Sequence, residues 1–327
     1  MLRRLILLVL AVAVVLGGVF VWWMQHPMAA VTQARLLEVP QGAHLREVAR
    51  RVAETTETDS WPFILLARVT GNGSRLRAGT YTIEPGSTPL NVLSKLVRGD
   101  VMTSTVTVVE GWTFAQMRAA IAASPDLRHD ASSLTDSQLM TELGAPGVAP
   151  EGRFFPDTYR FAKGSSDLAL YRQAYDAMHH ALDTAWAARA QPHPLASADE
   201  MLILASIVEK ETGQASDRRK IAAVFLNRLR TGMLLQTDPT VIYGMGPRFD
   251  GNLRRVDLLT DTPFNTYTRA GLPPTPISLP GKASIDAVVN PDTTDALYFV
   301  ARGDGSSEFS SNLDAHNRAV NKFQRHQ

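Results

Sequence analysis

The sequence contains no cysteine, so disulfides, thiol nucleophiles and cysteine-ligated metals are excluded. It also has no H-E-x-x-H motif, and the adjacent His179 and His180 would point in different directions on a helix, so they cannot both serve one metal. The net charge of +1 gives no indication of nucleic-acid binding. We therefore expect no metal, no cofactor and no nucleic-acid partner.

Long hydrophobic runs are also scarce, with one exception near the start. Leu5 to Met24 is an uninterrupted apolar run, and roughly 20 apolar residues span a bilayer as a helix. Arg3 and Arg4 precede it, and Trp22 and Trp23 end it at the level of an aromatic belt. The pattern predicts a cytoplasmic start and an uncleaved anchor over residues 1–26, with the rest of the chain outside. A cleaved signal peptide is the alternative, but the run is too long and no clear A-x-A site follows.

The 327 residues leave room for two folded domains after this anchor. A strand, a turn glycine and an amphipathic helix recur three times, around Gly42, Gly86 and Gly111, with apolar residues at matching offsets after each glycine. Residues 61–69 predict a further helix, and residues 76–83 a strand. Thr113 and Gln116 predict a capping box for the third helix. The fold class is therefore α+β.

The stretch from Ser197 to Gly213 predicts a buried helix. Ser197 and Glu200 form a capping box, and Gly213 is the expected stop. Apolar residues cover most of the circumference, which is typical of a buried helix. They are Met201, Leu202, Ile203, Leu204, Ala205, Ile207 and Val208.

This helix ends in Glu209, Lys210 and Glu211. At about 100° per residue, the two glutamates lie on opposite flanks of the apolar face. A carboxyl placed there is partly desolvated, which raises its pKa and suits it to donate a proton near neutral pH. The alternative is that both are ordinary residues of the last helical turn. The residues alone do not distinguish Glu209 from Glu211.

Residues 150–161 form an ordered loop rich in aromatic side chains and carboxylates, including Glu151, Asp157 and Tyr159. Rings stack on the apolar faces of sugars and carboxylates accept hydrogen bonds from hydroxyls, so the loop is a candidate sugar site. A packed structural loop is the alternative reading.

Further polar residues follow the glutamates. Ser216 is expected to cap a helix from Asp217 to Thr231 that ends at Gly232. Asn227 and Arg228 lie beside its apolar face. We expect a loop with Pro239 to carry Gln236, Thr237, Asp238 and Tyr243, and another to carry Asn265 and Tyr267. A β-hairpin over residues 297–310 and a helix from Leu313 to the end complete the expected chain.

Several motifs together carry a family resemblance. In order, they are E-G-x-x-x-P-D-T-Y-x-F from Glu151, I-V-E-K-E-T, V-F-L-N-R-L, L-L-Q-T-D-P-T-V-I-Y-G, F-N-T-Y and G-L-P-P-T-P-I. This chain resembles the endolytic murein transglycosylase family (MltG, YceG-like). The resemblance implies that the first glutamate of the E-K-E motif, Glu209, is the catalytic acid/base. As a set, the polar residues above become expected substrate-binding residues: Glu151, Asp157, Tyr159, Glu211, Asn227, Arg228, Gln236, Thr237, Asp238, Tyr243, Asn265 and Tyr267.

The resemblance also implies the domain plan and the reaction. Residues 34–103 would be a LysM-like module and residues 104–327 the catalytic domain. LysM modules bind glycans, but aromatic platforms are sparse here (Trp61, Phe63, Tyr81), so a spacer is equally expected. The enzyme would cut the β-1,4 bond between N-acetylmuramic acid and N-acetylglucosamine within peptidoglycan strands. The C6 hydroxyl of the muramic acid attacks its own anomeric carbon and leaves a 1,6-anhydro end.

One carboxyl suffices for that reaction, because the second nucleophile belongs to the substrate. Ordinary glycosidases need two carboxyl groups. A lysozyme-type hydrolase, with Glu151, Asp157 or Asp238 activating water, is therefore one alternative. A non-enzymatic glycan-binding tether of the envelope is the other. Peptidoglycan strands and the cytoplasmic (inner) membrane are the expected partners, with peptidoglycan synthases as candidate protein partners.

Overall fold

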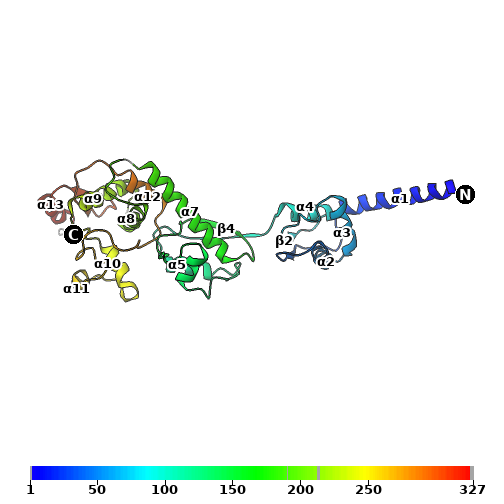
Figure 1. Ribbon diagram of the computed structural model, residues 1–327, viewed down its shortest axis with the longest axis horizontal. Coiled ribbons are helices and arrows are strands. Elements are labelled where there is room, and N and C mark those ends of the chain that lie inside the picture. The colour runs from blue at the N-terminus through cyan, green and yellow to red at the C-terminus, as the bar shows by residue number, and fades with distance from the viewer. Residues whose placement is uncertain (1, 190, 212–213, 325–327) are drawn as a thin grey trace. The chain divides into compact units, whose positions relative to one another are not determined.

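The computed structural model describes residues 2–189, 191–211 and 214–324, and it mixes helices with short strands (Figure 1). This confirms the predicted mixture of helices and strands behind one N-terminal apolar helix. The chain divides into two compact units. Unit 1 comprises Met1–Thr105, Asp126–Arg128 and Arg160–Ser166. Unit 2 comprises Val106–Pro125, His129–Tyr159 and Asp167–Gln327.

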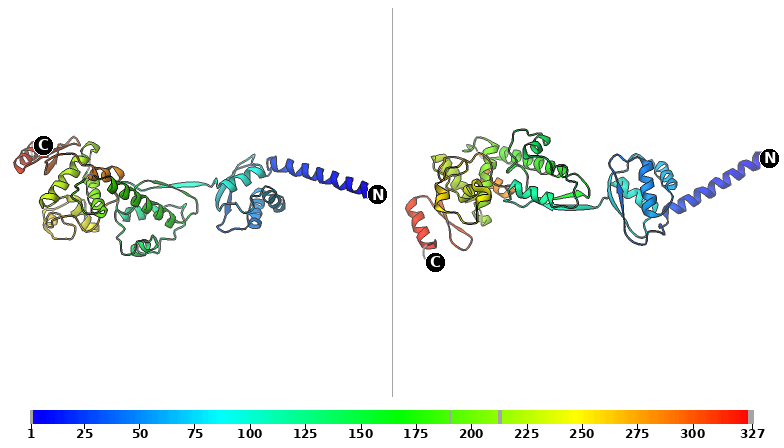
Figure 2. Two further views of the ribbon diagram at one scale, coloured as in Figure 1. Left: turned by 45° about the horizontal axis from the view of Figure 1, so that its top comes forward. Right: turned by 90° about the horizontal axis from the view of Figure 1, so that it is seen from below.

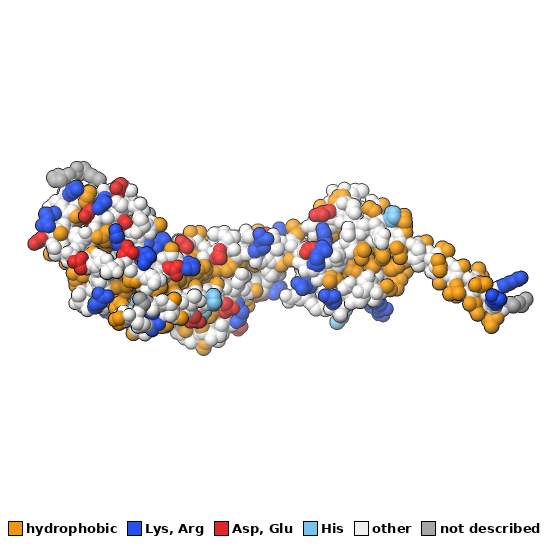
Figure 3. Space-filling view, turned by 90° about the horizontal axis from the view of Figure 1, so that it is seen from above, with side chains coloured by type: hydrophobic (Ala, Val, Ile, Leu, Met, Phe, Trp, Pro, Cys, Tyr) orange, Lys and Arg blue, Asp and Glu red, His pale blue; other side chains and the backbone are white. Residues whose placement is uncertain are grey.

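The first helix, α1 (Leu2–Gln25), is the one helix in the described part of the chain that is long and apolar enough to cross a membrane. Its most apolar stretch has a mean hydropathy of 3.0, and none of it is buried in the protein. Figure 3 shows hydrophobic side chains along the helix and basic side chains near its beginning. The helix is therefore consistent with a single-pass membrane anchor.

The rest of unit 1 packs helices on a two-stranded antiparallel sheet in which Leu37 lies opposite Tyr81. Leu37 and Tyr81 both face the core, where α2 and α4 contribute Val48 and Leu96. In Figures 1 and 2 these elements gather into one body at the end of α1. The elements are β1 (Arg35–Val39), α2 (Leu45–Thr56), α3 (Ser60–Val69), β2 (Gly79–Ile83) and α4 (Pro89–Arg98).

The repeated pattern of strand, turn glycine and helix is confirmed. Gly42, Gly86 and Gly111 each adopt a positive φ, of 75°, 82° and 77°, which a residue with a side chain adopts only under strain. Each glycine stands between a strand and a helix. The third repeat consists of β3 (Thr103–Thr107), which pairs with β4 (Thr158–Ala162), and α5 (Phe114–Ala122).

Unit 2 is mostly helical around α8 (Ala198–Glu211). As predicted, α8 is buried on most of its circumference, because α7, α9 and α12 supply apolar side chains to the same core. The remaining elements are α6 (Asp136–Glu142), α7 (Asp167–Ala188), η1 (Ala215–Asp217), α9 (Arg218–Thr231), α10 (Asp238–Met245), η2 (Gly246–Arg248), α11 (Arg255–Leu259), α12 (Lys282–Val289), β5 (Tyr298–Ala301), β6 (Ser307–Ser310) and α13 (Leu313–Gln324).

Most predicted helix boundaries hold. The Ser197 hydroxyl accepts from the Glu200 N–H at 3.2 Å, and the capping box of Thr113 and Gln116 is present. Strands β5 and β6 form the predicted terminal hairpin. The expected stop at Gly213 and the last residues of the final helix lie outside the described residues.

Two local predictions are wrong. Tyr243 lies on α10, because Pro239 occupies the first turn of that helix, where its missing N–H costs no hydrogen bond. Ser216 does not cap α9: the chain passes through η1, and the Asp217 carboxylate accepts from the Ser307 N–H instead.

Candidate active site

Glu209 ends α8 beside the first residues of α12. Its Oε2 accepts two hydrogen bonds, from the Gly281 N–H at 3.0 Å and from the Ser284 hydroxyl at 2.7 Å. Gly281 is the N-cap of α12, and the free N–H groups of a helix start carry positive partial charge. The half-buried carboxyl of Glu209 is therefore held by two donors at the start of α12.

The turn of the third repeat packs against the same glutamate. The Gly111 N–H donates to the Leu279 carbonyl at 2.9 Å, and the Leu279 N–H donates to the Trp112 carbonyl at 2.6 Å. The Lys210 ammonium donates to the Gly111 carbonyl at 3.3 Å. A Cβ at Gly111 would lie 3.7 Å from Cγ of Glu209. These contacts fix the turn of residues 110–112 beside the end of α8.

This turn brings a second carboxylate, Glu110, to the site. A Cβ placed on Gly281 would lie only 1.9 Å from Oε1 of Glu110, so Glu110 occupies the space that the glycine leaves open. Gly281 also donates to Glu209, so both carboxyl groups lie next to one residue. Glu110 is exposed, and within the described residues it makes no side-chain hydrogen bond or ion pair. Sequence reasoning missed it, although it directly precedes a turn glycine.

Two serines attach the segment before α12 to α8. The Ile277 N–H donates to the Ser206 hydroxyl at 3.0 Å, and the Ser278 hydroxyl donates to the Ser206 carbonyl at 3.0 Å. Both serines are fully buried. Sequence reasoning missed this pair as well, because the two residues are far apart in the chain. Their effect is to attach the segment that leads to Gly281 to α8 about one turn before Glu209. We call Glu110, Glu209, Gly281 and Ser284 the Glu209 centre.

Glu211 lies in different surroundings. Its Oε1 accepts from the Thr237 hydroxyl, and burial raises the pKa of the Glu211 carboxyl, with the nearby Asp238 acting in the same direction. The Thr237 hydrogen bond and the charge of Arg228 oppose that shift. Thr237 is itself fixed, since its N–H donates to the Thr266 hydroxyl at 3.1 Å.

A cavity of about 710 Å³ opens on this side of α8. Five of the predicted substrate-binding residues line it, and the hairpin and last helix add Tyr298 and His316. The five are Glu211, Arg228, Gln236, Asp238 and Tyr267. The cavity therefore combines aromatic rings with hydrogen-bonding groups of both charges.

The tyrosine and glutamine of this cavity are held in place. The Tyr267 hydroxyl donates to Oδ1 of Asp238 at 2.5 Å, and burial raises the pKa of Tyr267. Gln236 has a φ of 47°, unusual for a residue with a side chain, and its N–H donates to the Thr266 carbonyl at 3.0 Å. A left-handed backbone at a predicted site residue is a form of local strain that often occurs at functional sites.

Arg228 and Asn227 hold the chain before the terminal hairpin. The Arg228 guanidinium donates to the carbonyls of Leu297 and Leu235, each at 2.7 Å, and lies 5.3 Å from the ring centre of Tyr298. The Asn227 amide donates to two carbonyls at 2.9 and 3.0 Å, those of Thr294 and Ala296. In the structure both side chains support the walls of the cavity.

The Glu151 side chain is buried, and both of its carboxyl oxygens accept hydrogen bonds. Its Oε1 accepts from the Phe114 N–H at 2.9 Å and its Oε2 from the Tyr243 hydroxyl at 3.1 Å. Burial raises the pKa of Glu151 to about 7, and both hydrogen bonds act against that shift. Since each oxygen already has a partner, Glu151 joins the start of α5 to α10.

The stretch predicted as a loop over residues 150–161 ends in β4, which carries Tyr159. Tyr159 and Asp157 have local roles. The buried Tyr159 donates its hydroxyl to the Phe155 carbonyl. Asp157 is exposed and accepts from the N–H of Thr158 at 2.7 Å. Gly152 packs closely on Pro276, where a Cβ would come within 2.4 Å. The loop thus supports the segment that leads to the Glu209 centre.

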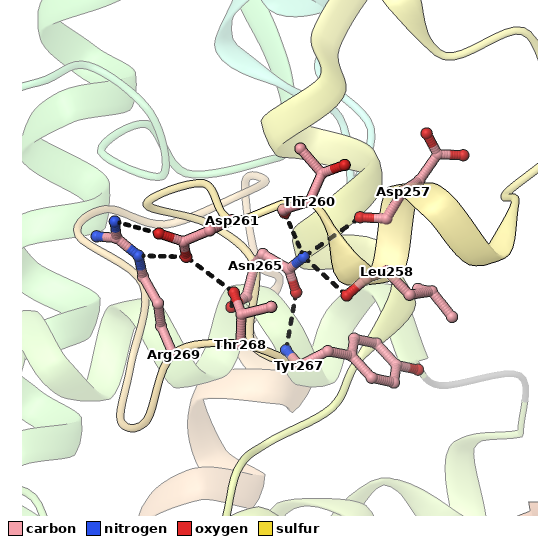
Figure 4. A network of polar contacts seen from close by, with 8 residues as sticks. All are labelled: Asp257, Leu258, Thr260, Asp261, Asn265, Tyr267, Thr268 and Arg269. Atoms are coloured by element: carbon pink, nitrogen blue, oxygen red, sulfur yellow. Dashed lines mark hydrogen bonds and ion pairs between the residues drawn. The ribbon is translucent and has the colours of Figure 1, made fainter.

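Asn265 organises the loop that carries Tyr267 (Figure 4). Its amide nitrogen donates to the carbonyls of Leu258 at 3.1 Å and Thr260 at 2.7 Å, and its Oδ1 accepts from the Tyr267 N–H at 2.9 Å. The exposed ion pair of Asp261 and Arg269 closes the same loop. Asn265 is fully buried, so it acts through the position of Tyr267.

Of the predicted residues, Glu209 alone belongs to the Glu209 centre, while the others lie around the cavity beside Glu211 or in and around the segment that carries Glu151. No group of three or more histidine, aspartate or glutamate side chains suited to a metal ion occurs within the described ranges.

Comparison with known proteins gives a consistent result. The chain is 29% identical over 329 residues to the endolytic murein transglycosylase of Bacillus subtilis, covering 94% of this chain and 91% of that protein. It is 25% identical to the endolytic murein transglycosylase of Streptococcus pneumoniae, covering 86% of this chain but 57% of that longer protein. A crystal structure of a YceG-like protein from Listeria monocytogenes is 27% identical, with a TM-score of 0.56, and the match covers 88% of this chain and 99% of that one.

A model of the YceG-like family matches residues 37–322. This range covers most of both units and every residue of the Glu209 centre. The resemblance carried by the sequence motifs is thereby confirmed, and the chain belongs to the YceG-like family.

Proposed function

We propose that this protein is an endolytic murein transglycosylase. It cleaves the β-1,4 bond between N-acetylmuramic acid and N-acetylglucosamine within glycan strands and leaves 1,6-anhydro ends. Membership of the YceG-like family and the similarity to two endolytic murein transglycosylases support the activity. The single observation that supports Glu209 as the catalytic residue is its position at the start of α12, where two donors hold one carboxyl oxygen.

Glu209 acts as acid and then as base. A proton on Oε1, the oxygen that Gly281 and Ser284 do not contact, passes to the glycosidic oxygen as the bond breaks. The carboxylate that remains is stabilised by these two donors and by the helix start. It then accepts the proton of the C6 hydroxyl as that oxygen bonds to the anomeric carbon. No water is consumed, so the products together have the mass of the substrate.

Glu110 stabilises the positive charge that develops on the sugar ring. An oxocarbenium-like transition state gains from a fixed negative charge nearby. Glu110 is exposed and adjoins Gly281, and its backbone is fixed by the hydrogen bonds between residues 111–112 and Leu279. It therefore supplies a negative charge next to the Glu209 centre's Gly281.

The cavity beside Glu211 binds the glycan strand. Tyr267 and Tyr298 offer rings for the apolar faces of sugars, and Asp238 and Gln236 offer hydrogen bonds to hydroxyl and acetamido groups. Of the predicted substrate-binding residues, Arg228, Asn227 and Asn265 contribute by holding this cavity in shape. Glu151, Asp157 and Tyr159 contribute by supporting the loop behind residue 276.

A lysozyme-type hydrolase is less well supported. Both oxygens of Glu151 have partners, Asp157 accepts from its neighbour's N–H, and Asp238 accepts from Tyr267. Each of the three carboxylates proposed to activate water is therefore already engaged.

Mass spectrometry of the products from purified murein tests the proposal. Incubation with the full chain should release muropeptides ending in 1,6-anhydro-N-acetylmuramic acid, 18 mass units lighter than the hydrolysed form, an arithmetic consequence of the missing water. Fragments of several disaccharides indicate endolytic cutting. Products that have gained water would support the hydrolase, and no products at all would support the glycan-binding tether.

Residues 34–103 are proposed as a LysM-like module and residues 104–327 as the catalytic domain. Of the three rings that could stack on a glycan, Phe63 and Tyr81 are buried in the core of unit 1, and Trp61 is exposed. Glycan binding by this module therefore has weak support, and a spacer function is favoured.

We further propose that α1 is a single-pass anchor in the cytoplasmic membrane and that both units lie on the outer side, where murein is. The basic Arg3 and Arg4 before the apolar helix support this orientation. A fusion of alkaline phosphatase after Gln327 should be active, and a fluorescent protein that folds only in the cytoplasm should be dark at the same position. The reverse pattern would exclude both the orientation and the substrate. Peptidoglycan synthases are candidate partners in that compartment.

A further inference from the structure

Helix α3 of unit 1 has two apolar faces, and the protein covers only one of them. Phe63, Leu66 and Ala67 are buried in the core of the unit. On the other face Trp61, Leu65 and Val69 are 63%, 40% and 71% exposed. Because they are spaced four residues apart, their side chains lie above one another as a stripe along the helix. We call these three residues the α3 stripe.

The α3 stripe belongs to the end of unit 1 at which α1 enters. Phe20, Trp23 and Met24 of α1 pack against the core of unit 1, and both α1 and α3 contact α4. Figures 1 and 2 show α3 beside the junction with α1. In the space-filling view, hydrophobic side chains gather on this end of the unit (Figure 3).

This junction determines how far unit 1 stands from the bilayer. Trp22 and Trp23 lie at the end of the apolar helix, where aromatic side chains occupy the headgroup region. The core of unit 1 already begins at Phe20, so no linker separates it from the membrane surface. An apolar face at this end of the unit therefore lies near the membrane surface at which α1 ends.

We infer that the α3 stripe inserts into the headgroup region of the bilayer and holds unit 1 flat against the membrane. Trp61 suits this position, since its ring is apolar and its N–H can bond to water or lipid. The one charged residue within α3, Arg68, is exposed and in its last turn, from which it reaches lipid phosphates. The inference rests on the proposed anchoring of α1, but not on the cleavage reaction.

The absence of cysteine makes a direct test possible, since a single introduced cysteine is the one labelling site. Leu65→Cys and Val69→Cys probe the stripe. Arg50→Cys probes an exposed position on α2, where the side chain is 59% exposed, and is the matched control. Each full-length variant carries an environment-sensitive fluorophore. It is reconstituted into vesicles of phosphatidylcholine and phosphatidylglycerol, some with bromine on the lipid tails, and iodide serves as the aqueous quencher.

The fluorophores at residues 65 and 69 should be quenched by the brominated lipids at least threefold more than the one at residue 50, and less by iodide. Equal quenching at all three positions overturns the inference. Protection from iodide without quenching by lipid also overturns it. Disulfide formation between Val69→Cys copies would then identify a second copy as the occupant, and protection only with added glycan would identify a sugar.

Flotation of the same vesicles tests separately whether α1 anchors the protein in the membrane. If the protein floats with the vesicles but the three positions behave alike, α1 is an anchor and the stripe is not a membrane contact. If the protein does not float, the anchoring proposal fails and the inference fails with it. Neither readout depends on murein cleavage.

Discussion

Two glutamates that stand two residues apart on α8 have opposite surroundings. Glu209 lies against the start of α12, where the Gly281 N–H and the Ser284 hydroxyl donate to one of its oxygens. Glu211 is buried beside Asp238, and this burial raises its pKa. A separation of two residues turns a side chain by about 200° around a helix, so one short motif reaches two sites. Their different roles follow from the elements that each flank of α8 meets.

The two flanks of α8 also differ in the function that their side chains suit, bond cleavage on one flank and glycan binding on the other. The Glu209 centre holds two carboxyl groups around Gly281, and one of them, Glu110, makes no side-chain hydrogen bond or ion pair with other described residues. The Glu211 side holds a cavity of about 710 Å³ with aromatic walls. The first arrangement suits proton transfer and charge stabilisation, and the second suits the holding of a long polymer.

The largest expected effect comes from Glu209→Gln, which keeps the shape of the side chain and removes the proton. A general acid contributes roughly 10²- to 10⁴-fold, so murein cleavage should fall by about that factor. Glu211→Gln is the matched control on the opposite flank and should stay within about tenfold of the wild-type rate, because its loss affects binding only. Muropeptide release per unit time measures both. If the Glu211 variant is inactive while the Glu209 variant still cuts, the two roles are assigned the wrong way round.

A smaller loss is expected for Glu110→Gln. Removing one electrostatic stabiliser of a transition state costs on the order of 10- to 100-fold in kcat, with little change in KM, since the charge matters only as the sugar ring becomes positive. Glu142→Gln, an exposed glutamate at the end of α6, is the control. An increase in KM with unchanged kcat would show that Glu110 binds substrate and does not stabilise the transition state.

Ser284→Ala tests the donors at the start of α12. A hydrogen bond to a charged group contributes about 1.5–3 kcal/mol, so losing one of the two donors to Glu209 should lower kcat about tenfold while Gly281 keeps the carboxyl near its place. Ser311→Ala, an exposed serine after β6, should leave the rate unchanged. A Ser284→Ala enzyme with full activity would mean that the helix start is not part of the machinery.

The sequence predicted the elements of this site better than its contacts. Periodicity identified α8 and its burial, because apolar residues surround most of the helix. The terminal hairpin and the capping box of α5 were also correct. These features depend on residues that are near one another in the chain, so a local pattern is enough to predict them.

Gly281, Ser284 and Glu110 were not found, because their importance arises only when α12 and the turn at Gly111 meet the end of α8. No periodic pattern encodes a contact between residues more than 70 positions apart. Tyr243 was placed in a loop because Pro239 was read as a barrier to a helix, whereas it stands inside the first turn of α10. Proline does disfavour a helical conformation in the residue before it. The sequence alone did not show that Pro239 stands in the first turn of a helix, where proline is tolerated.

Glu151 is a third glutamate to compare with Glu209 and Glu211, and both of its carboxyl oxygens accept hydrogen bonds. Its substitution is expected to have the smallest effect, on stability and not on cleavage. Burial raises its pKa to about 7 from an ordinary value of 4.5, so the folded protein binds this proton more tightly than the unfolded chain. The stability contributed by neutral Glu151 is therefore fully present below pH 4.5 and is lost as the pH rises through about 7.

Glu151→Gln cannot ionise, so its free energy of unfolding should not decline over this interval, whereas that of the wild type should. The difference in favour of the variant should reach about 1–3 kcal/mol at pH 8. Urea unfolding at pH 5, 6, 7 and 8 measures it, and cleavage at pH 6 should be nearly unchanged. Tyr243→Phe removes a hydrogen bond that lowers the pKa of Glu151, so the decline in stability of this variant should continue to a higher pH than that of the wild type. A Glu151→Gln protein that parallels the wild type at every pH would show that Glu151 is not the titrating group. Loss of cleavage with normal stability would instead place Glu151 beside Glu209 in the chemistry.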